Sequence, residues 1–120
     1  MSKRIIIVED EKPMQKALTI KLQNEGFEVE NASEAGEFFQ KIEKGNFDLI
    51  LLDLMLPKIS GFEILEKLKG QNNQIPVVVA SNLSQEEDKK RSKDLGALDY
   101  IVKSDTSLLE IVEKIKTLLK

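Results

Sequence analysis

Short apolar runs alternate with longer amphipathic stretches along the chain. The runs at residues 5–8, 49–52 and 77–80 are unbroken, which is typical of strands that are buried on both faces of a parallel sheet. A shorter run at 100–102 predicts a similar strand, and the alternating residues 27–30 predict an edge strand. The pattern therefore predicts five strands, each followed by a helix.

The stretches between the strands carry apolar residues at helical spacing. These stripes are Met14, Ala17, Leu18 and Leu22; Phe38, Phe39 and Ile42; Ile64, Leu65 and Leu68; and Leu108, Ile111, Val112, Ile115, Leu118 and Leu119. Strict alternation of strand and helix predicts an α/β fold of five β-α units, (βα)5, built as a three-layer sandwich around a parallel five-stranded sheet.

Residues typical of helix ends stand at the predicted boundaries. Two serine–glutamate pairs have the spacing of capping boxes, and four glycines stand where helices should end in a left-handed conformation. These residues are Ser60 with Glu63, Ser84 with Glu87, and Gly26, Gly45, Gly70 and Gly96. The fourth helix differs from the others because residues 84–94 contain no apolar residue. This pattern indicates a solvated helix face, or alternatively a helix that is loosely docked because it buries little apolar area.

The composition restricts the chemistry that the chain can perform. A chain of 120 residues is long enough for one domain, which we expect to span residues 1–120. The net charge of −3 predicts no direct nucleic-acid binding. The absence of Cys and His excludes thiolate and imidazole chemistry, so a bound metal should be a hard cation with oxygen ligands. The apolar runs are too short to span a membrane, and we expect a soluble, cytoplasmic protein.

Polar residues follow four of the predicted strands directly. Glu9 and Asp10 follow the first, Asp53 the third, Ser81 the fourth and Lys103 the fifth. Ligands bind open parallel sheets at the carboxyl ends of the strands, and in the common strand order 2-1-3-4-5 the first and third strands are neighbours. The three carboxylates should then converge, and they would repel one another unless a cation were bound. Mg²⁺ fits best, since it takes carboxylate ligands and serves phosphoryl chemistry.

Each of these residues also has an ordinary interpretation. Asp10 could cap the first helix, Ser81 could be a loop serine, and Lys103 could be a solvated lysine. Asp53 is more informative, because it lies between apolar residues 49–52 and 54–57. Acidic side chains are rarely found in such surroundings unless they have a specific role or partner. The combination of these groups at one sheet edge predicts a phosphoryl site.

The sequence resembles the receiver domain of two-component response regulators, the superfamily of the chemotaxis receiver, over essentially its whole length. Residues 6–11 resemble the first strand and acidic pair of the family, and residues 48–57 resemble the strand that carries the phosphorylated aspartate. Residues 61–65 match the following glycine and helix, and residues 95–103 match the approach to the family lysine. The resemblance implies a flavodoxin-like sheet and a signalling domain in a phosphorelay, not a classical enzyme.

The resemblance also implies roles for individual residues. Asp53 would accept a phosphoryl group from the phosphohistidine of a sensor histidine kinase or a histidine phosphotransfer protein. Asp10, Asp53 and the backbone carbonyl of Met55 would bind Mg²⁺ directly, and Glu9 would act largely through water. Lys103 would pair with the phosphoryl group or with Asp53.

Two further positions resemble the family switch. Ser81 would supply the switch hydroxyl and Tyr100 the switch aromatic ring. Phosphorylation would draw Ser81 inward and shift the face formed by the fourth helix, the fifth strand and the fifth helix. That face would control a downstream effector protein or a fused output domain. It could also form a homodimer, although Leu98 stands where regulators with that dimer usually have an acid.

The chain departs from the family pattern near the site. Ser104 stands where the family usually has a proline after a cis peptide bond, and a trans bond there would bring the placement of Lys103 into question. Asn82 replaces a small residue and would narrow access to Asp53. Met55 and Leu83 are apolar and cannot orient an attacking water, so we expect slow dephosphorylation.

Three alternatives come from other classes of protein. A phosphatase of the haloacid-dehalogenase type would need an acid at Met55, and a flavodoxin-like cofactor carrier would not place acids in its first loop. The third, a receiver-like interaction scaffold that is not regulated by phosphorylation, stays open because of Asn82 and Ser104.

Overall fold

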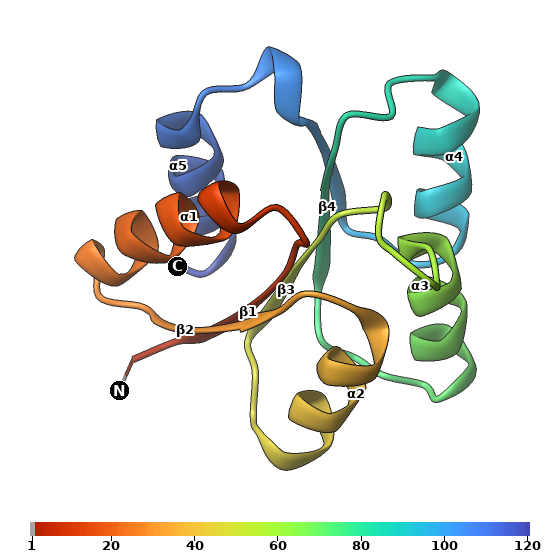
Figure 1. The fold of residues 1–120 in the computed structure, drawn as a ribbon, viewed down its shortest axis with the longest axis horizontal. Helices are drawn as coiled ribbons and strands as arrows, with labels where there is room; N and C mark the ends of the chain where they lie inside the picture. Colours follow the sequence, from red (N-terminus) through yellow and green to blue (C-terminus); the bar gives the residue numbers. More distant parts are fainter. Residues whose placement is uncertain (1) are drawn as a thin grey trace.

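The central feature of the fold is a parallel sheet. The computed structural model describes residues 2–120, and its strands lie in the order β2-β1-β3-β4-β5 (Figure 1). The strands are β1 (Arg4–Val8), β2 (Glu28–Ala32), β3 (Leu49–Leu52), β4 (Val77–Ser81) and β5 (Asp99–Val102). The predicted fold and strand order are confirmed, with strand ends that differ from the predicted ones by one or two residues.

The middle strands are buried on both faces, as their unbroken apolar runs predict. Every residue of β3 and β4 is buried, and in β1 all but Arg4 are buried. β2 pairs with β1 alone within the described chain and is largely half-buried, which explains its alternating sequence. β1 lies between β2 and β3, with Ile6 opposite both Glu30 and Ile50. The first and third strands therefore end side by side.

Helices cover both faces of the sheet. They are α1 (Lys12–Asn24), α2 (Ala35–Lys44), α3 (Gly61–Gly70), α4 (Glu86–Asp94) and α5 (Leu108–Leu118), with a short 3-10 helix, η1 (Lys103–Asp105), before α5. α1 and α5 lie on one face, whereas α2, α3 and α4 lie on the other (Figure 1). None of the helices in residues 2–120 is long and apolar enough to cross a membrane.

Two apolar cores result, one on each side of the sheet. Alternate residues of β1 face opposite cores: Ile5 and Ile7 join the core under α1 and α5, while Ile6 and Val8 join the core under α2 and α3. The same strands contribute to both cores, so the helices on both faces pack against one sheet. The carboxyl ends of the strands are thereby fixed relative to one another.

The predicted capping boxes are wrong. The side chain of Ser60, the N-cap of α3, makes no capping hydrogen bond within the described chain. α4 begins at Glu86, so Gln85 takes the N-cap position and the Ser84 spacing is out of register. The structure instead has a capping box at α5, where Ser107 accepts from the Glu110 amide and Glu110 accepts from the Ser107 amide.

Helices end at or beside all four predicted glycines, but the left-handed conformation is confirmed at two of them and wrong at the other two. Gly26 and Gly96 have φ of 94° and 101°, the left-handed region that glycine adopts without strain. Gly45 has an extended backbone with φ of −117°, and Gly70 is still the last residue of α3. β3 begins at Leu49, four residues after Gly45, and the extended backbone of Gly45 leads the chain away from α2 toward that strand.

Charged side chains dominate the packing of α4. Within Glu86–Asp94, Ser92 alone is buried. The Arg91 guanidinium lies 4.1 Å from the centre of the Phe62 ring and 3.4 Å from Glu66, and Lys69 donates to the Asp94 carbonyl at 2.9 Å. α4 is therefore held to α3 by polar and cation–π contacts, which contribute modestly where they are exposed to water.

Candidate functional site

Three carboxylates meet where β1 and β3 end. Glu9, Asp10 and Asp53 each offer an oxygen, and these oxygens all lie within 4.8 Å of one another. Glu9 and Asp53 are buried, with exposed fractions of 3% and 5%, whereas Asp10 is exposed. The convergence predicted from the strand order is therefore present, because β1 and β3 are adjacent and parallel.

Lys103, the first residue of η1 and the one directly after β5, reaches the same cluster. Its Nζ atom lies 2.6 Å from Glu9 Oε1 and 2.9 Å from Asp53 Oδ2, and its side chain is 6% exposed. All peptide bonds of residues 2–120 are trans, so Lys103 reaches both carboxylates with a trans bond before Ser104. The substitution of serine for the family proline does not displace the lysine.

Burial and charge shift the pKa values of two of these groups. Burial raises the pKa of Glu9, and the nearby charge of Asp53 raises it further, against the hydrogen bond from Lys103. For Lys103, burial works to lower the pKa, but hydrogen bonds to Glu9 and Asp53 outweigh it and the pKa is raised. The single ammonium does not fully compensate the buried carboxylates, so the cluster favours an additional positive charge.

Gln15 is a site residue that was not predicted from the sequence. Its buried side-chain amide donates to the backbone carbonyl of Glu9 and to Ser33 Oγ, the latter at 3.0 Å. It therefore joins the loop after β1 to the end of β2. Its position could have revealed it, because Gln15 lies three and seven residues before Leu18 and Leu22 and so shares their buried face.

A glycine allows α3 to approach the acidic cluster. A Cβ atom on Gly61 would lie 2.5 Å from the Asp53 carbonyl oxygen and 2.6 Å from Leu54 Cα. The Gly61 amide donates to the Leu54 carbonyl at 2.9 Å. Asp53 itself is oriented by the Met55 amide, which donates to its Oδ1 at 3.0 Å. Close backbone contacts thus hold the loop that carries Asp53.

The cluster opens to solvent through a pocket of about 310 Å³. Its lining residues are Asp10, Glu11, Asp53, Met55, Asn82 and Lys103. Asn82 is exposed and forms part of the wall, and the Met55 side chain is 55% exposed. A small polar molecule can therefore reach Asp53 from outside.

Ser81 and Tyr100 meet at Leu83, outside the lining of this pocket. Ser81 is fully buried, and its Oγ accepts from the Leu83 amide at 3.3 Å. The Tyr100 hydroxyl donates to the Leu83 carbonyl at 2.6 Å. Burial raises the pKa of Tyr100, so it remains a donor at neutral pH. The two predicted switch residues therefore bind the same loop residue from β4 and β5.

The model of one protein family matches almost the whole chain. Residues 5–116 match the response regulator receiver domain. The chain belongs to this family. Receiver domains are signalling domains of two-component systems, which agrees with an open acidic pocket at the carboxyl edge of a parallel sheet.

Individual relatives of this receiver domain agree with the family match. It is 38% identical over 120 residues to regulatory protein VanRc of Enterococcus gallinarum, covering 100% of this chain and 51% of VanRc. The chain thus spans about half the length of the curated relatives it matches.

Solved structures match as well. A CheY-like response regulator receiver domain protein from Methanospirillum hungatei is 35% identical, with a TM-score of 0.91 and coverage of 99% of this chain and 94% of that chain. Response regulator TrrA from Thermotoga maritima, in complex with Mg²⁺-BeF, is 33% identical with a TM-score of 0.84, covering 97% and 98%. These likenesses extend over the complete receiver fold.

Proposed function

We propose that this receiver domain accepts a phosphoryl group on Asp53 from the phosphohistidine of a sensor histidine kinase or a histidine phosphotransfer protein. The observation that carries this proposal is the position of Asp53, a buried carboxylate that is paired with Lys103 at 2.9 Å and lines a solvent-open pocket. A carboxylate with a purely structural role would not need to line a pocket that is open to solvent.

The chemistry is a displacement at phosphorus. A carboxylate oxygen of Asp53 forms a bond to phosphorus as the phosphorus–nitrogen bond of phosphohistidine breaks, and the imidazole leaves with the bonding electrons and takes up a proton. Phosphoryl transfer depends mainly on positioning and on compensation of negative charge. Lys103 is already placed within hydrogen-bond distance of Asp53 and can follow the new phosphoryl oxygens.

Mg²⁺ fits the oxygen donors at this site. Asp10, Asp53 and the backbone carbonyl of Met55 would hold it directly, with Glu9 acting through water. The raised pKa of Glu9 supports a cation here, because the buried carboxylates have more negative charge than Lys103 balances. The bound ion would neutralise charge on the phosphoryl oxygens. The presence of Mg²⁺-BeF in the related TrrA structure supports the same assignment.

The switch follows from the shared contacts of Ser81 and Tyr100. A phosphoryl oxygen on Asp53 would compete with the Leu83 amide for Ser81, and Tyr100 is tied to the same loop residue. The loop between β4 and α4 would then move, and with it the face formed by α4, β5 and α5. Ser81 thus acts as the switch hydroxyl and Tyr100 as the switch aromatic ring.

A partner that binds the face formed by α4, β5 and α5 would carry out the response to phosphorylation. We infer a downstream effector protein or a fused output domain, since the curated relatives are about twice as long as this chain. A homodimer through α4, β5 and α5 is a further proposal, and Leu98, which is 57% exposed, counts against it because regulators with that dimer usually have an acid at this position. We assign residues 1–120 to one cytoplasmic receiver domain that signals without being a classical enzyme and binds neither nucleic acid nor membrane directly.

The phosphoacceptor proposal has a direct test. The protein is incubated with Mg²⁺ and acetyl phosphate, and its intact mass is measured beside that of Asp53→Asn. The expected result is an adduct of ~80 Da, the mass of a phosphoryl group, on the wild type alone. A matched control is Asp99→Asn, which lies on β5 outside the pocket and should still be phosphorylated. Without an adduct that depends on Asp53, the interaction scaffold becomes the better function.

The lifetime of the phosphorylated form tests the roles of Met55 and Leu83. Leu83 has no hydrogen-bonding group and the Met55 thioether is only a weak acceptor, so neither side chain holds a water molecule well for attack on phosphorus, and hydrolysis should be slow. Met55→Asn places an amide at the pocket wall and should shorten the half-life by about tenfold. Loss of the adduct over time, followed by mass spectrometry, measures this difference. Equal half-lives would show that residue 55 does not limit the attack of water.

A further inference from the structure

Glu11 is an exposed carboxylate at the rim of the pocket. It follows Asp10 directly, its side chain is 66% exposed, and its Oε1 atom lies 3.7 Å from Lys103 Nζ. It lines the same pocket as Asp53 but is not one of the three residues whose oxygens cluster together. Glu11 therefore adds charge to the entrance without being needed to hold a cation.

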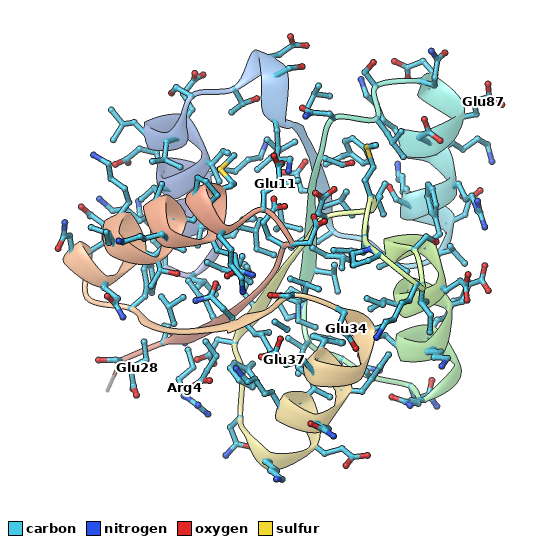
Figure 2. The ribbon with its side chains drawn as sticks, viewed as in Figure 1. Arg4, Glu11, Glu28, Glu34, Glu37 and Glu87 are labelled. Atoms are coloured by element: carbon cyan, nitrogen blue, oxygen red, sulfur yellow. The ribbon has the colours of Figure 1, made fainter. Side chains whose placement is uncertain are left out.

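Glu11 carries the negative charge at the pocket that a divalent cation and Lys103 would leave unbalanced. A divalent cation and the Lys103 ammonium together balance Glu9, Asp10 and Asp53. The remaining negative charge belongs to Glu11, which faces the solvent from which a phosphodonor arrives. Figure 2 shows Glu11 at the end of the sheet where the chain passes from β1 to α1, while Glu28 lies at the opposite end and Glu87 lies on α4.

We propose that Glu11 biases phosphodonor specificity by repelling small dianions, so that free acyl phosphates react more slowly with the domain than they would without this charge, and phosphohistidine on a docked protein is favoured over them. This inference rests on the proposed role of Asp53 as phosphoacceptor. A free phosphodonor makes no contacts with the domain outside the pocket, so the negative charge of Glu11 slows its approach. A protein donor is also held by contacts away from the pocket, which compensate for the repulsion.

The reaction with acetyl phosphate isolates this effect. A carboxylate oxygen of Asp53 bonds to phosphorus, the phosphorus–oxygen bond to the acetyl group breaks, and acetate leaves with the electron pair. Acetyl phosphate is a dianion at neutral pH, whereas phosphoramidate has one net negative charge. Repulsion by Glu11 should therefore slow the first donor more than the second.

The test compares three glutamate-to-glutamine variants with the wild type. Glu11→Gln removes the charge at the rim, and Glu28→Gln and Glu87→Gln remove exposed charges elsewhere. Mg²⁺ is raised to saturation for each protein, as judged by a calorimetric titration, and the phosphorylation rate is measured by mass spectrometry at low ionic strength. Glu11→Gln should react with acetyl phosphate about threefold faster, since one charge acts on a dianion across roughly 10 Å of water.

Several comparisons decide the outcome. The ratio of the Glu11→Gln rate to the wild-type rate should be smaller with phosphoramidate than with acetyl phosphate, and it should fall toward one as salt is added. Glu28→Gln and Glu87→Gln should react at the wild-type rate. A wild-type rate in Glu11→Gln, confirmed with Glu11→Ala, would overturn the inference while leaving the phosphoacceptor role intact. An equal, salt-independent acceleration with both donors would also overturn it, because it would indicate a change in Lys103 rather than repulsion. A wild type with no Asp53-dependent adduct would instead refute the proposed function, and the inference with it.

Discussion

The Lys103 ammonium lies 2.6 Å from Glu9 Oε1, closer than its 2.9 Å approach to Asp53 Oδ2. Lys103 therefore shares its charge between two buried carboxylates that come from neighbouring strands. Each acid is partly compensated, and Glu9 has a raised pKa because of its burial. This arrangement is suited to receiving a cation and a phosphoryl group, and it should reduce the stability of the metal-free fold.

The first prediction concerns the stability of Glu9→Gln without metal. The raised pKa of Glu9 means that the folded state binds its proton more tightly than the unfolded state. The corresponding stability is present below the ordinary pKa of a glutamate, 4.5, and is lost as pH rises through the folded pKa. A neutral glutamine avoids this loss, so Glu9→Gln should increase the free energy of unfolding at pH 7 by about 1 kcal/mol.

Urea unfolding between pH 4 and pH 8 measures this effect, with Glu37→Gln as the control. The pKa of Glu37 is lowered by its hydrogen bond from the Ser33 amide, so its contribution has the opposite sign: it is present at neutral pH and lost as pH falls. Glu37→Gln should therefore reduce stability at pH 7. A loss of stability in Glu9→Gln as well would mean that its ion pair with Lys103 outweighs burial.

The second prediction concerns Gln15, whose amide holds the loop after β1. Gln15→Met keeps the length of the side chain and removes both hydrogen bonds, to the Glu9 carbonyl and to Ser33. Because groups that orient metal ligands affect affinity strongly, Mg²⁺ should bind about tenfold more weakly. Calorimetric titration gives this affinity, and Gln23→Met, an exposed position on the same helix, should leave it unchanged. Equal affinities in both variants would assign Gln15 a packing role alone.

The third prediction compares two glycines of α3. Gly61→Ala brings a Cβ atom within 2.5 Å of the Asp53 carbonyl oxygen, whereas a Cβ on Gly70 meets nothing within 4 Å among the described residues. Gly61→Ala should therefore destabilise the fold by about 2 kcal/mol or more. Gly70→Ala should stabilise it by about 0.5–1 kcal/mol through helix propensity. Thermal unfolding of both variants tests the pair, and a harmless Gly61→Ala would show that the loop at Asp53 can move.

The fourth prediction concerns the docking of α4. Within Glu86–Asp94 one residue is buried, whereas α5 buries Ile111, Val112 and Ile115. Because buried apolar area resists local opening, backbone amides of α4 should exchange with deuterium at least tenfold faster than those of α5. Arg91→Ala removes the contact with Phe62 and should widen the difference. Equal protection of the two helices would contradict loose docking.

The fold was predictable because its main signals are local. Unbroken apolar runs identify strands that are covered on both faces, and helical stripes identify the layers that cover them. Asp53 was identifiable for the same reason, as an acid at the end of such a run. The capping box at Ser84 failed because α4 begins one residue later than predicted, so that Gln85 takes the N-cap position. Ser60 does take the N-cap position of α3, but its side chain makes no capping hydrogen bond in the described chain.

Other features depended on distances that a sequence does not contain. Gln15 looks like a polar residue on an amphipathic helix, and its role appears once the helix is packed against the end of β1. Gly61 looks like a helix start until the Asp53 backbone is seen against it. The trans bond before Ser104 still brings Lys103 to Asp53, since η1 turns the chain after β5.

By itself, the sequence determined the order of the strands and helices, the burial of the sheet and the acids at its carboxyl edge, because these follow from patterns between near neighbours in the chain. The tertiary structure alone decided that Lys103 binds Glu9 as well as Asp53, and that Glu11 remains at the rim while Glu9 is buried. These relationships join residues that are far apart in the chain, and their energies depend on distances and burial that arise only when the sheet is closed by its helices.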